Sequence, residues 1–248
     1  MAQANCGRKD RGARSGRIAV SSARGLIKKG KSGKSMLKVD FKRELKNLYA
    51  APAKDFTIVD VPAMHYLMID GSGDPNTSQS YKDAIEALYA ASYAIKFSSK
   101  IGLGRDYTVP PLEGLWWADD MTSFTRGEKS AWRWSMMIMR PSWIIPAMIE
   151  DAIAALRVKK ALPALSLLRD ERLDEGRSVQ IMHIGSYEDE APVLARLHHE
   201  FMPKHGLTFS GKHHEIYISD PRKTPPEKLK TVLRQPVKPV DISSGSPK

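Results

Sequence analysis

The sequence has a single cysteine, Cys6, and no long uninterrupted run of apolar residues. One cysteine excludes an internal disulfide framework and a zinc site built from clustered cysteines. A membrane-spanning helix needs about 20 apolar residues in a row, so a membrane protein is excluded as well. We therefore expect a cytoplasmic protein without a membrane partner. Its 248 residues allow one large domain or two small ones.

Acidic residues are almost absent from residues 1–35, which hold ten basic side chains and one acid, Asp10. This segment supplies nine of the eleven net positive charges, so the basic character belongs to a leader and not to a domain. A Gly-, Ser-, Arg- and Lys-rich segment buries too little apolar surface to fold. We predict a disordered basic leader over 1–35, a folded domain over 36–238 and a flexible tail over 239–248.

Three interpretations of the leader stay open. It resembles a tail that binds nucleic acid, because basic residues dominate it. Its Ser-rich, acid-poor composition is also found in transit peptides, although it shows no clear amphipathic helix. The third interpretation is a dispensable extension ahead of a start at Met36.

The remaining sequence alternates between strand and helix periods. Strands are predicted over 56–70, with a break at Pro62, and over 106–118, 130–139, 164–169, 177–184 and 213–219. Helices are predicted over 77–99, after Ser142, and from Ser186 to Gly206. A strand, a glycine loop, a helix and a glutamate-bearing strand occur twice: Met68, Gly71 and Glu113, then Met182, Gly185 and Glu215. Two such halves can pair about a pseudo-two-fold axis and enclose a concave pocket. The predicted fold class is α+β.

All five tryptophans fall within 28 residues: Trp116, Trp117, Trp132, Trp134 and Trp143. Strand alternation places Trp132, Trp134 and Met136 on one face, whereas Trp117 shares a face with Glu113 and Trp116 points the other way. Aromatic rings attract cations and planar ligands, and a desolvated glutamate supplies a counter-charge. The alternative is a tryptophan-rich core with Glu113 at a solvated strand end.

A second polar group lies on the last predicted strand, where His213, Glu215 and Tyr217 share one face. His183 and Tyr187 are placed to join it. A metal site is the alternative, because His198-His199 and His213-His214 are present. Adjacent residues diverge in space and no helix carries a histidine pair at i, i+4, so no metal is predicted.

Five segments carry a family resemblance. They are Gly114–Trp117, Trp132–Ile138, Gln180–Tyr187, Gly211–Arg222 and Leu229–Val237. Together they resemble the stand-alone GyrI-like small-molecule-binding proteins, over residues 38 to 238. The resemblance implies tandem strand–helix–strand–strand units around a ligand cleft, in agreement with the repeat.

In the wider superfamily this module is the effector domain of multidrug-sensing regulators, where a buried glutamate meets planar aromatic cations. Other members inhibit DNA gyrase, and some hydrolyse the cyclopropane of DNA-alkylating natural products. The resemblance implies Glu113 and Glu215 as catalytic carboxylates of a hydrolase without metal or cofactor. The implied ligand-binding residues are Trp116, Trp117, Trp132, Trp134, Met136, His183, Tyr187, His213 and Tyr217.

The alternative function is a non-catalytic binding module or a gyrase-interacting module. Two glutamates in one pocket favour chemistry, because one stays charged while the pKa of the other rises. No helix-turn-helix module is recognised in the sequence, so we expect no direct sequence-specific DNA binding.

Overall fold

The computed structural model describes residues 38–120 and 126–241. The predicted leader and residues 242–248 of the predicted tail lie outside these ranges. The strands are β1 (Lys38–Val39), β2 (Thr57–Val61), β3 (Met64–Ser72), β4 (Asp106–Tyr107), β5 (Leu112–Trp117), β6 (Arg133–Arg140), β7 (Arg169–Leu173), β8 (Gly176–Ile184), β9 (Leu207–Phe209), β10 (His213–Tyr217) and β11 (Lys230–Pro239).

The α-helices are α1 (Phe41–Glu44), α2 (Lys46–Tyr49), α3 (Gln79–Gly102), α5 (Pro146–Lys159), α6 (Ala191–Arg196) and α7 (Met202–Lys204). Between them lie short 3₁₀ turns, η1 (Lys129–Ala131), η2 (Pro163–Leu167), η3 (Tyr187–Glu190) and η5 (Pro226–Lys228), and one π-helical turn, η4 (Leu197–Phe201). Within the described residues, no helix is both long and apolar enough to cross a membrane.

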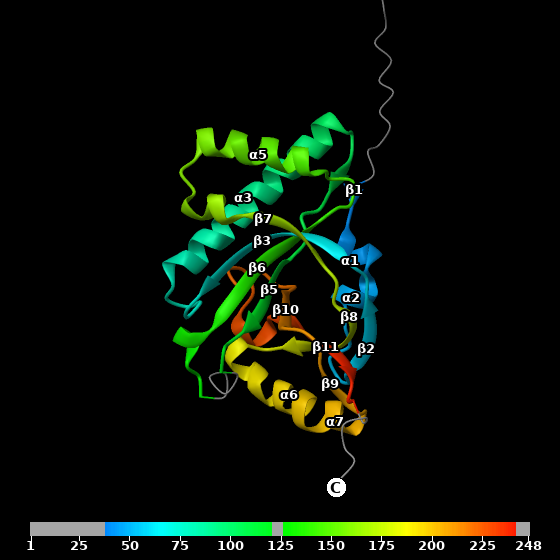
Figure 1. The fold of residues 1–248 in the computed structure, drawn as a ribbon. Helices are drawn as coiled ribbons and strands as arrows, with labels where there is room; N and C mark the ends of the chain where they lie inside the picture. The colour runs from blue at the N-terminus through cyan, green and yellow to red at the C-terminus, as the bar shows by residue number, and fades with distance from the viewer. Residues whose placement is uncertain (1–37, 121–125, 242–248) are drawn as a thin grey trace, which may run out of the picture. The chain divides into compact units, whose positions relative to one another are not determined.

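One large sheet joins the two predicted halves (Figure 1). Its strand order is β2-β8-β11-β10-β5-β6-β3-β7, and β9 pairs with β11 outside this path. Each half repeats the same order, β5-β6-β3 and β10-β11-β8, and the halves meet where β5 runs antiparallel to β10. This confirms the α+β fold built from tandem strand–helix–strand–strand units.

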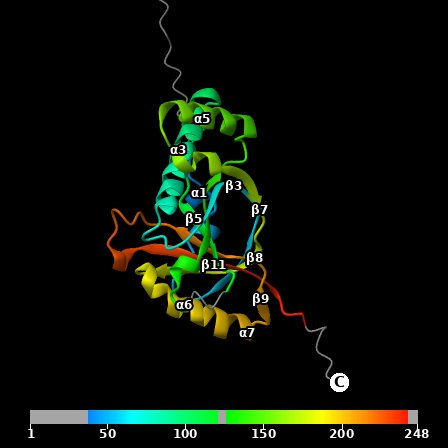
Figure 2. The same ribbon diagram turned by 60° about the vertical axis from the view of Figure 1, so that its left-hand side comes forward.

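Helical segments cover one face of the sheet, which we call the helix face. Ser78 caps α3 by accepting a hydrogen bond from the Tyr81 amide, and small residues such as Ala84 and Ala91 bring α3 close to the strands. The π-helical turn and α7 pack on Val179 and related residues of the second half. Figures 1 and 2 show α3 with α5 at one end of the sheet and α6 with α7 at the other.

The opposite face is covered by the short helices α1 and α2. Leu48 and Tyr49 of α2 are buried against Met182, Ile216 and Val232. The Leu48 carbonyl accepts a hydrogen bond from Arg234 Nη2 at 2.9 Å, so the backbone of α2 is bonded directly to the side chains of the sheet. The central strands are therefore buried on both faces.

Three local predictions need correction or adjustment. The second helix does not start after Ser142, because α5 begins at Pro146, whose fixed φ suits a first helical residue. Residues 164–168 are not a strand: Pro163 opens the turn η2, and β7 starts at Arg169. Strand β11 reaches Pro239, one residue into the predicted tail, because it pairs there with β9.

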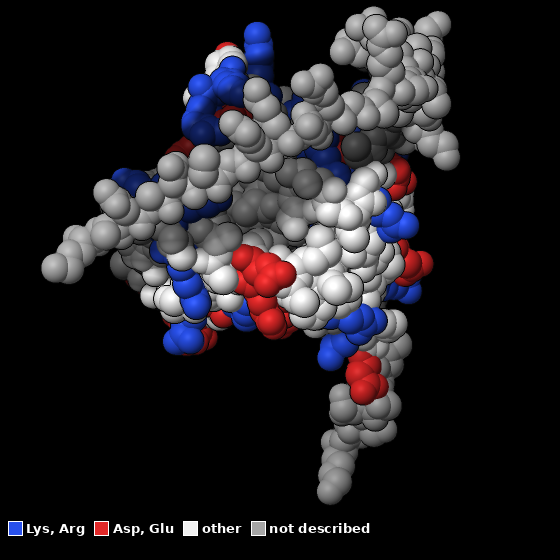
Figure 3. Space-filling model, turned by 90° about the horizontal axis from the view of Figure 1, so that it is seen from above, with Lys and Arg blue, Asp and Glu red and all other residues white. Residues whose placement is uncertain are grey.

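Charged side chains of both signs occur together on the surface of the described residues. In the view from above, Lys and Arg side chains stand beside Asp and Glu side chains (Figure 3). Mixed signs are consistent with the near-neutral charge that the sequence leaves to residues 36–248.

Candidate ligand-binding site

The two predicted catalytic carboxylates lie on neighbouring strands but on opposite faces of the sheet. In the register of β5 and β10, Glu215 stands opposite Gly114, and Glu113 stands opposite Ile216. Directly opposed residues of antiparallel strands point to the same side, so Glu113 and Glu215 point away from each other. The prediction that both enter one cleft is therefore wrong. The reason is a register offset of one residue.

Glu215 lies on the helix face at the junction of the two halves. Its Oε2 accepts a hydrogen bond from Tyr217 Oη at 2.9 Å, and Tyr217 Oη accepts one from Trp116 Nε1 at 3.0 Å. His213 Nε2 lies 3.5 Å from Glu215 Oε1. The side chain of Glu215 is 15% exposed, so this carboxylate is largely desolvated but still open to solvent.

Aromatic rings surround this carboxylate on the helix face. Trp116 lies 5.9 Å from Trp132 and 6.2 Å from Tyr81 of α3, measured between ring centroids. On the other side Tyr187 packs edge-on against Tyr217 at 5.7 Å. Trp132 is half-buried and Tyr187 is exposed, so both rings are accessible at the surface of the cluster.

The other predicted binding residues lie outside this aromatic cluster. Trp134 and Met136 are on the helix face but fully buried in the core beneath α3. His183 also faces this side, where its Nε2 contacts the Ser186 carbonyl at 2.9 Å. Trp117 lies on the opposite face, with the ammonium of Lys212 3.2 Å from the centre of its ring. The structure thus brings Trp116, Trp132, Tyr187, His213, Glu215 and Tyr217 together.

Glu113 belongs to a buried chain of charged groups on the opposite face. Its Oε1 accepts a hydrogen bond from Tyr49 Oη at 3.0 Å, and its Oε2 lies 3.0 Å from His214 Nε2. His214 Nδ1 bonds Glu175 Oε1 at 2.9 Å, and Arg234 Nη1 donates to Glu175 Oε2 at 3.1 Å. We call these five residues the buried ion chain. Each of its ionisable side chains is 3% exposed or less.

The comparisons with known proteins support the fold and its class of function. The model of the GyrI-like small-molecule-binding domain matches residues 54–238. The chain belongs to the GyrI-like family. A search of the curated proteins found no match.

Solved structures from Listeria innocua are similar to this GyrI-like chain. An uncharacterized conserved protein is 40% identical, with a TM-score of 0.75 over 81% of this chain and 100% of its own. A protein described as a hydrolase is also 40% identical, with a TM-score of 0.70 over the same shares. A hydrolase encoded by lin2189 is 40% identical, with a TM-score of 0.73 over 82% of this chain and all of its own.

One carboxyl group near the GyrI-like site was missed in the sequence. Glu190 ends the turn η3, is 5% exposed and lies close enough to Glu215 to interact with it electrostatically. Burial and the charge of Glu215 raise its pKa to about 10, so Glu190 is protonated at neutral pH. Its place in the polar run Tyr187–Glu190 is typical of a solvated helix start, so the sequence alone held no signal of burial.

The buried ion chain was missed for a similar reason. Glu175 stood in a predicted turn, and Arg234 and Tyr49 lay outside the predicted strands and helices. Burial opposes both charged forms, but the interactions outweigh it: His214 and Arg234 lower the pKa of Glu175 to about 2, and Glu175 and Glu113 raise that of His214 to about 9. Glu175 and His214 are therefore both charged at neutral pH.

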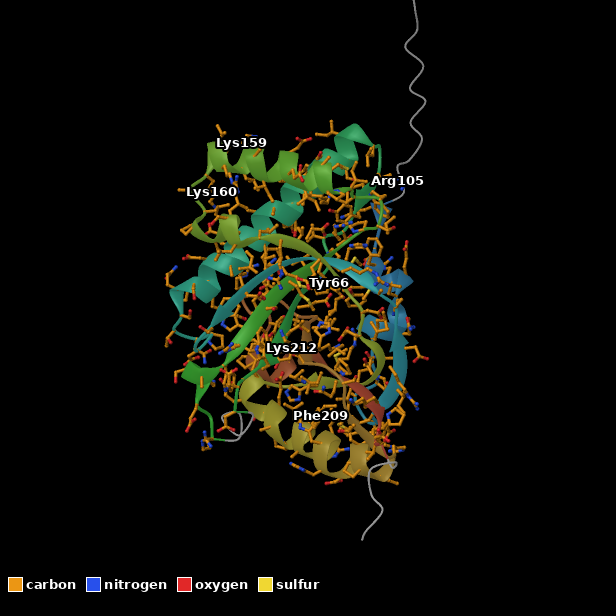
Figure 4. The ribbon with its side chains drawn as sticks, viewed as in Figure 1. Tyr66, Arg105, Lys159, Lys160, Phe209 and Lys212 are labelled. Atoms are coloured by element: carbon orange, nitrogen blue, oxygen red, sulfur yellow. The ribbon has the colours of Figure 1, made fainter. Side chains whose placement is uncertain are left out.

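A cavity of about 310 Å³ opens on the opposite face, beside Glu175. Its apolar lining comes from Met68, Leu115, Leu173 and Pro236. Lys212, labelled in Figure 4, also lines it. Among the described residues no cluster of His, Cys, Asp and Glu side chains is arranged to hold a metal ion.

Proposed function

We propose that this GyrI-like protein binds planar aromatic cations and electrophiles at the Glu215 cluster of the helix face. The main support is that the largely desolvated carboxylate of Glu215 is hydrogen-bonded by Tyr217 and surrounded by aromatic rings. A desolvated carboxylate favours a cation, and indole and phenol rings favour a flat aromatic body. The two requirements meet in one place.

We further propose that the bound electrophile is hydrolysed. Glu215 and the protonated Glu190 form an unlike pair of carboxyl groups, one suited to accept a proton and the other to donate one. The similarity to hydrolases of Listeria innocua at 40% identity supports a hydrolytic reaction. Glu190 therefore takes the role that the family resemblance implied for Glu113.

The proposed substrate is a cyclopropane conjugated to a carbonyl group, as in DNA-alkylating toxins. Glu215 takes a proton from water while the water oxygen bonds to the ring CH₂. The strained C–C bond breaks, and its electron pair moves through the conjugated system to the carbonyl oxygen. Glu190 gives that oxygen its proton. Substrate and water together give a single product. It carries an alcohol at the former ring CH₂ and a second hydroxyl group in place of the ketone.

The test separates binding from turnover. Ethidium, a permanent planar cation, serves as the binding probe in calorimetry, and a spirocyclopropyl dienone serves as substrate, followed by the absorbance of its phenol product. Glu215→Gln should weaken ethidium binding about tenfold or more and abolish turnover. Glu190→Gln should keep ethidium binding but slow turnover by roughly 10²–10⁴-fold, as for a lost general acid.

Glu188→Gln is the matched control, because Glu188 is exposed and lies two residues from Glu190. It should match the wild type in both assays. Unchanged ethidium binding by Glu215→Gln would contradict the proposed binding site. Binding without any turnover in the wild type would contradict hydrolysis and support the binding module instead.

A further inference from the structure

His214 holds two buried carboxylates together directly behind the proposed binding site. It stands between His213 and Glu215 on β10, but its side chain points to the opposite face. Its two ring nitrogens lie 3.0 Å and 2.9 Å from oxygens of Glu113 and Glu175. An ionised carboxylate only accepts hydrogen bonds, so carboxylate oxygens this close to both ring nitrogens favour a ring with both nitrogens protonated. The geometry therefore fits an imidazolium.

The titratable groups of this buried cluster come from five segments of the chain. They are Glu113 of β5, Glu175 of the β7–β8 turn, Arg234 of β11, Tyr49 of α2 and Tyr66 of β3. Two carboxylates balance one imidazolium and one guanidinium. Loss of the His214 proton leaves a buried negative charge without compensation, which is strongly unfavourable.

The buried ion chain connects the same two strands that carry the binding site. On the helix face, Trp116 of β5 and Tyr217 of β10 are joined by a hydrogen bond. On the opposite face, Glu113 of β5 and His214 of β10 are joined by an ion pair. A change in the attraction between Glu113 and His214 therefore acts on the spacing of Trp116, Glu215 and Tyr217.

The cavity gives this buried chain a path to solvent. Glu175 lines it, and the other acids of its lining are already paired: Glu171 with Arg169 at 2.6 Å and Asp174 with Arg172 at 3.5 Å. Glu175 is thus the residue at which the buried ion chain borders the cavity.

We propose that His214 is a positioning residue, whose imidazolium bridges Glu113 and Glu175 and so holds β10 in the register and spacing that ligand binding at Glu215 requires. The inference rests on the proposed function for its ligand. It adds that affinity depends on the protonation of a residue that the ligand does not touch.

The test is ethidium binding to the full chain between pH 7.5 and 9.5, by calorimetry. Wild-type affinity should fall on the order of tenfold across this range, as His214 loses its proton. His214→Gln lacks the titrating group, so it should bind more weakly at pH 7.5 and change little with pH. His199→Gln, which alters an exposed histidine of η4, should follow the wild type.

Glu190 needs a separate control because its pKa of about 10 lies near this range. The same series in the Glu190→Gln background should keep the pH dependence and should still lose it with His214→Gln. A wild-type affinity that is flat over the range, or a His214→Gln profile equal to that of the wild type, would overturn the proposal.

A measurement on the ligand-free wild type covers the case in which His214→Gln does not fold. Nitrogen NMR should show both ring nitrogens of His214 protonated up to pH 8, and the Trp116 indole N–H signal should shift with the same midpoint. If His214 titrates near pH 6.5, or if the Trp116 signal does not change as His214 titrates, the proposal that His214 positions the site is refuted. Failure of Glu215→Gln to affect ethidium, in contrast, refutes the binding site and leaves this NMR result standing.

Discussion

Glu190 is a buried carboxyl group, and the folded protein loses stability when this group is deprotonated. Burial and Glu215 raise its pKa from 4.5 to about 10 in the folded state. The folded protein therefore binds a proton that the unfolded chain releases above pH 4.5, and stability falls as pH rises between these values, by up to about 1.4 kcal/mol per pH unit. Glu190→Gln removes this penalty. In urea unfolding it should be more stable than the wild type at pH 8, with a smaller difference at pH 5.

The control for this measurement is again Glu188→Gln, which should unfold like the wild type at both pH values because Glu188 is exposed. A Glu190→Gln protein that is less stable than the wild type at pH 8 would contradict a neutral, buried Glu190. Improved stability together with slower turnover would mark Glu190 as a residue kept for function at the expense of stability.

Gly71 of β3 lies against the indole ring of Trp134. A Cβ atom at this position would overlap the six-membered ring of that indole, and Trp134 is fully buried under α3. Gly71→Ala should therefore destabilise the protein by about 1–3 kcal/mol, the usual cost of overpacking. Gly102→Ala places its methyl group in open space at the end of α3 and should leave the urea midpoint nearly unchanged. Equal effects of both substitutions would contradict the tight fit.

At the scale of strands, alternation predicted which side chains share a face within each strand but not how the strands align. It correctly separated Trp116 from Glu113 and Trp117, and His214 from Glu215. The register between β5 and β10 is decided by packing between segments about 100 residues apart, which no local pattern records. For this reason the sequence placed Glu113 in the cluster with Glu215, and missed its partners His214 and Glu175.

Strand β10 should lose stability in alkaline solution, because its His214 is charged in the folded state. Burial lowers the pKa of His214, but Glu175 and Glu113 outweigh burial and raise it to about 9 from 6.5. The stabilisation is fully present below pH 6.5 and is lost as pH rises through 9, with an upper limit of about 3 kcal/mol. The stability difference between wild type and His214→Gln should therefore shrink from pH 6.5 to pH 9.5 in urea unfolding. A constant difference over this range would contradict a charged His214.

At the scale of the whole molecule, the tandem fold was predictable because both halves repeat one order of strand, glycine loop, helix and strand. Composition also predicts that residues 1–35 are separate from this domain, which the deletion below tests. The role of residues 38–52 was not predictable. They lie before the family match, which begins at residue 54, and their short helices show too few turns for a helical period to be recognised. Only the structure shows that they cover the opposite face.

Two deletions separate the leader from this covering segment. Deletion of residues 1–35 should leave the melting temperature unchanged within error, because its composition cannot support a core. Deletion of residues 1–52 also removes Leu48 and Tyr49, the hydrogen bond from Tyr49 to Glu113, and the Pro52 carbonyl that accepts the Met182 amide. This deletion exposes apolar side chains and leaves Glu113 with one partner fewer, so the free energy of unfolding should fall by several kcal/mol.

Equal melting temperatures for both shortened proteins and the full chain would show that α1 and α2 contribute nothing to the domain. A lower melting temperature already on removal of residues 1–35 would show that the leader packs on it.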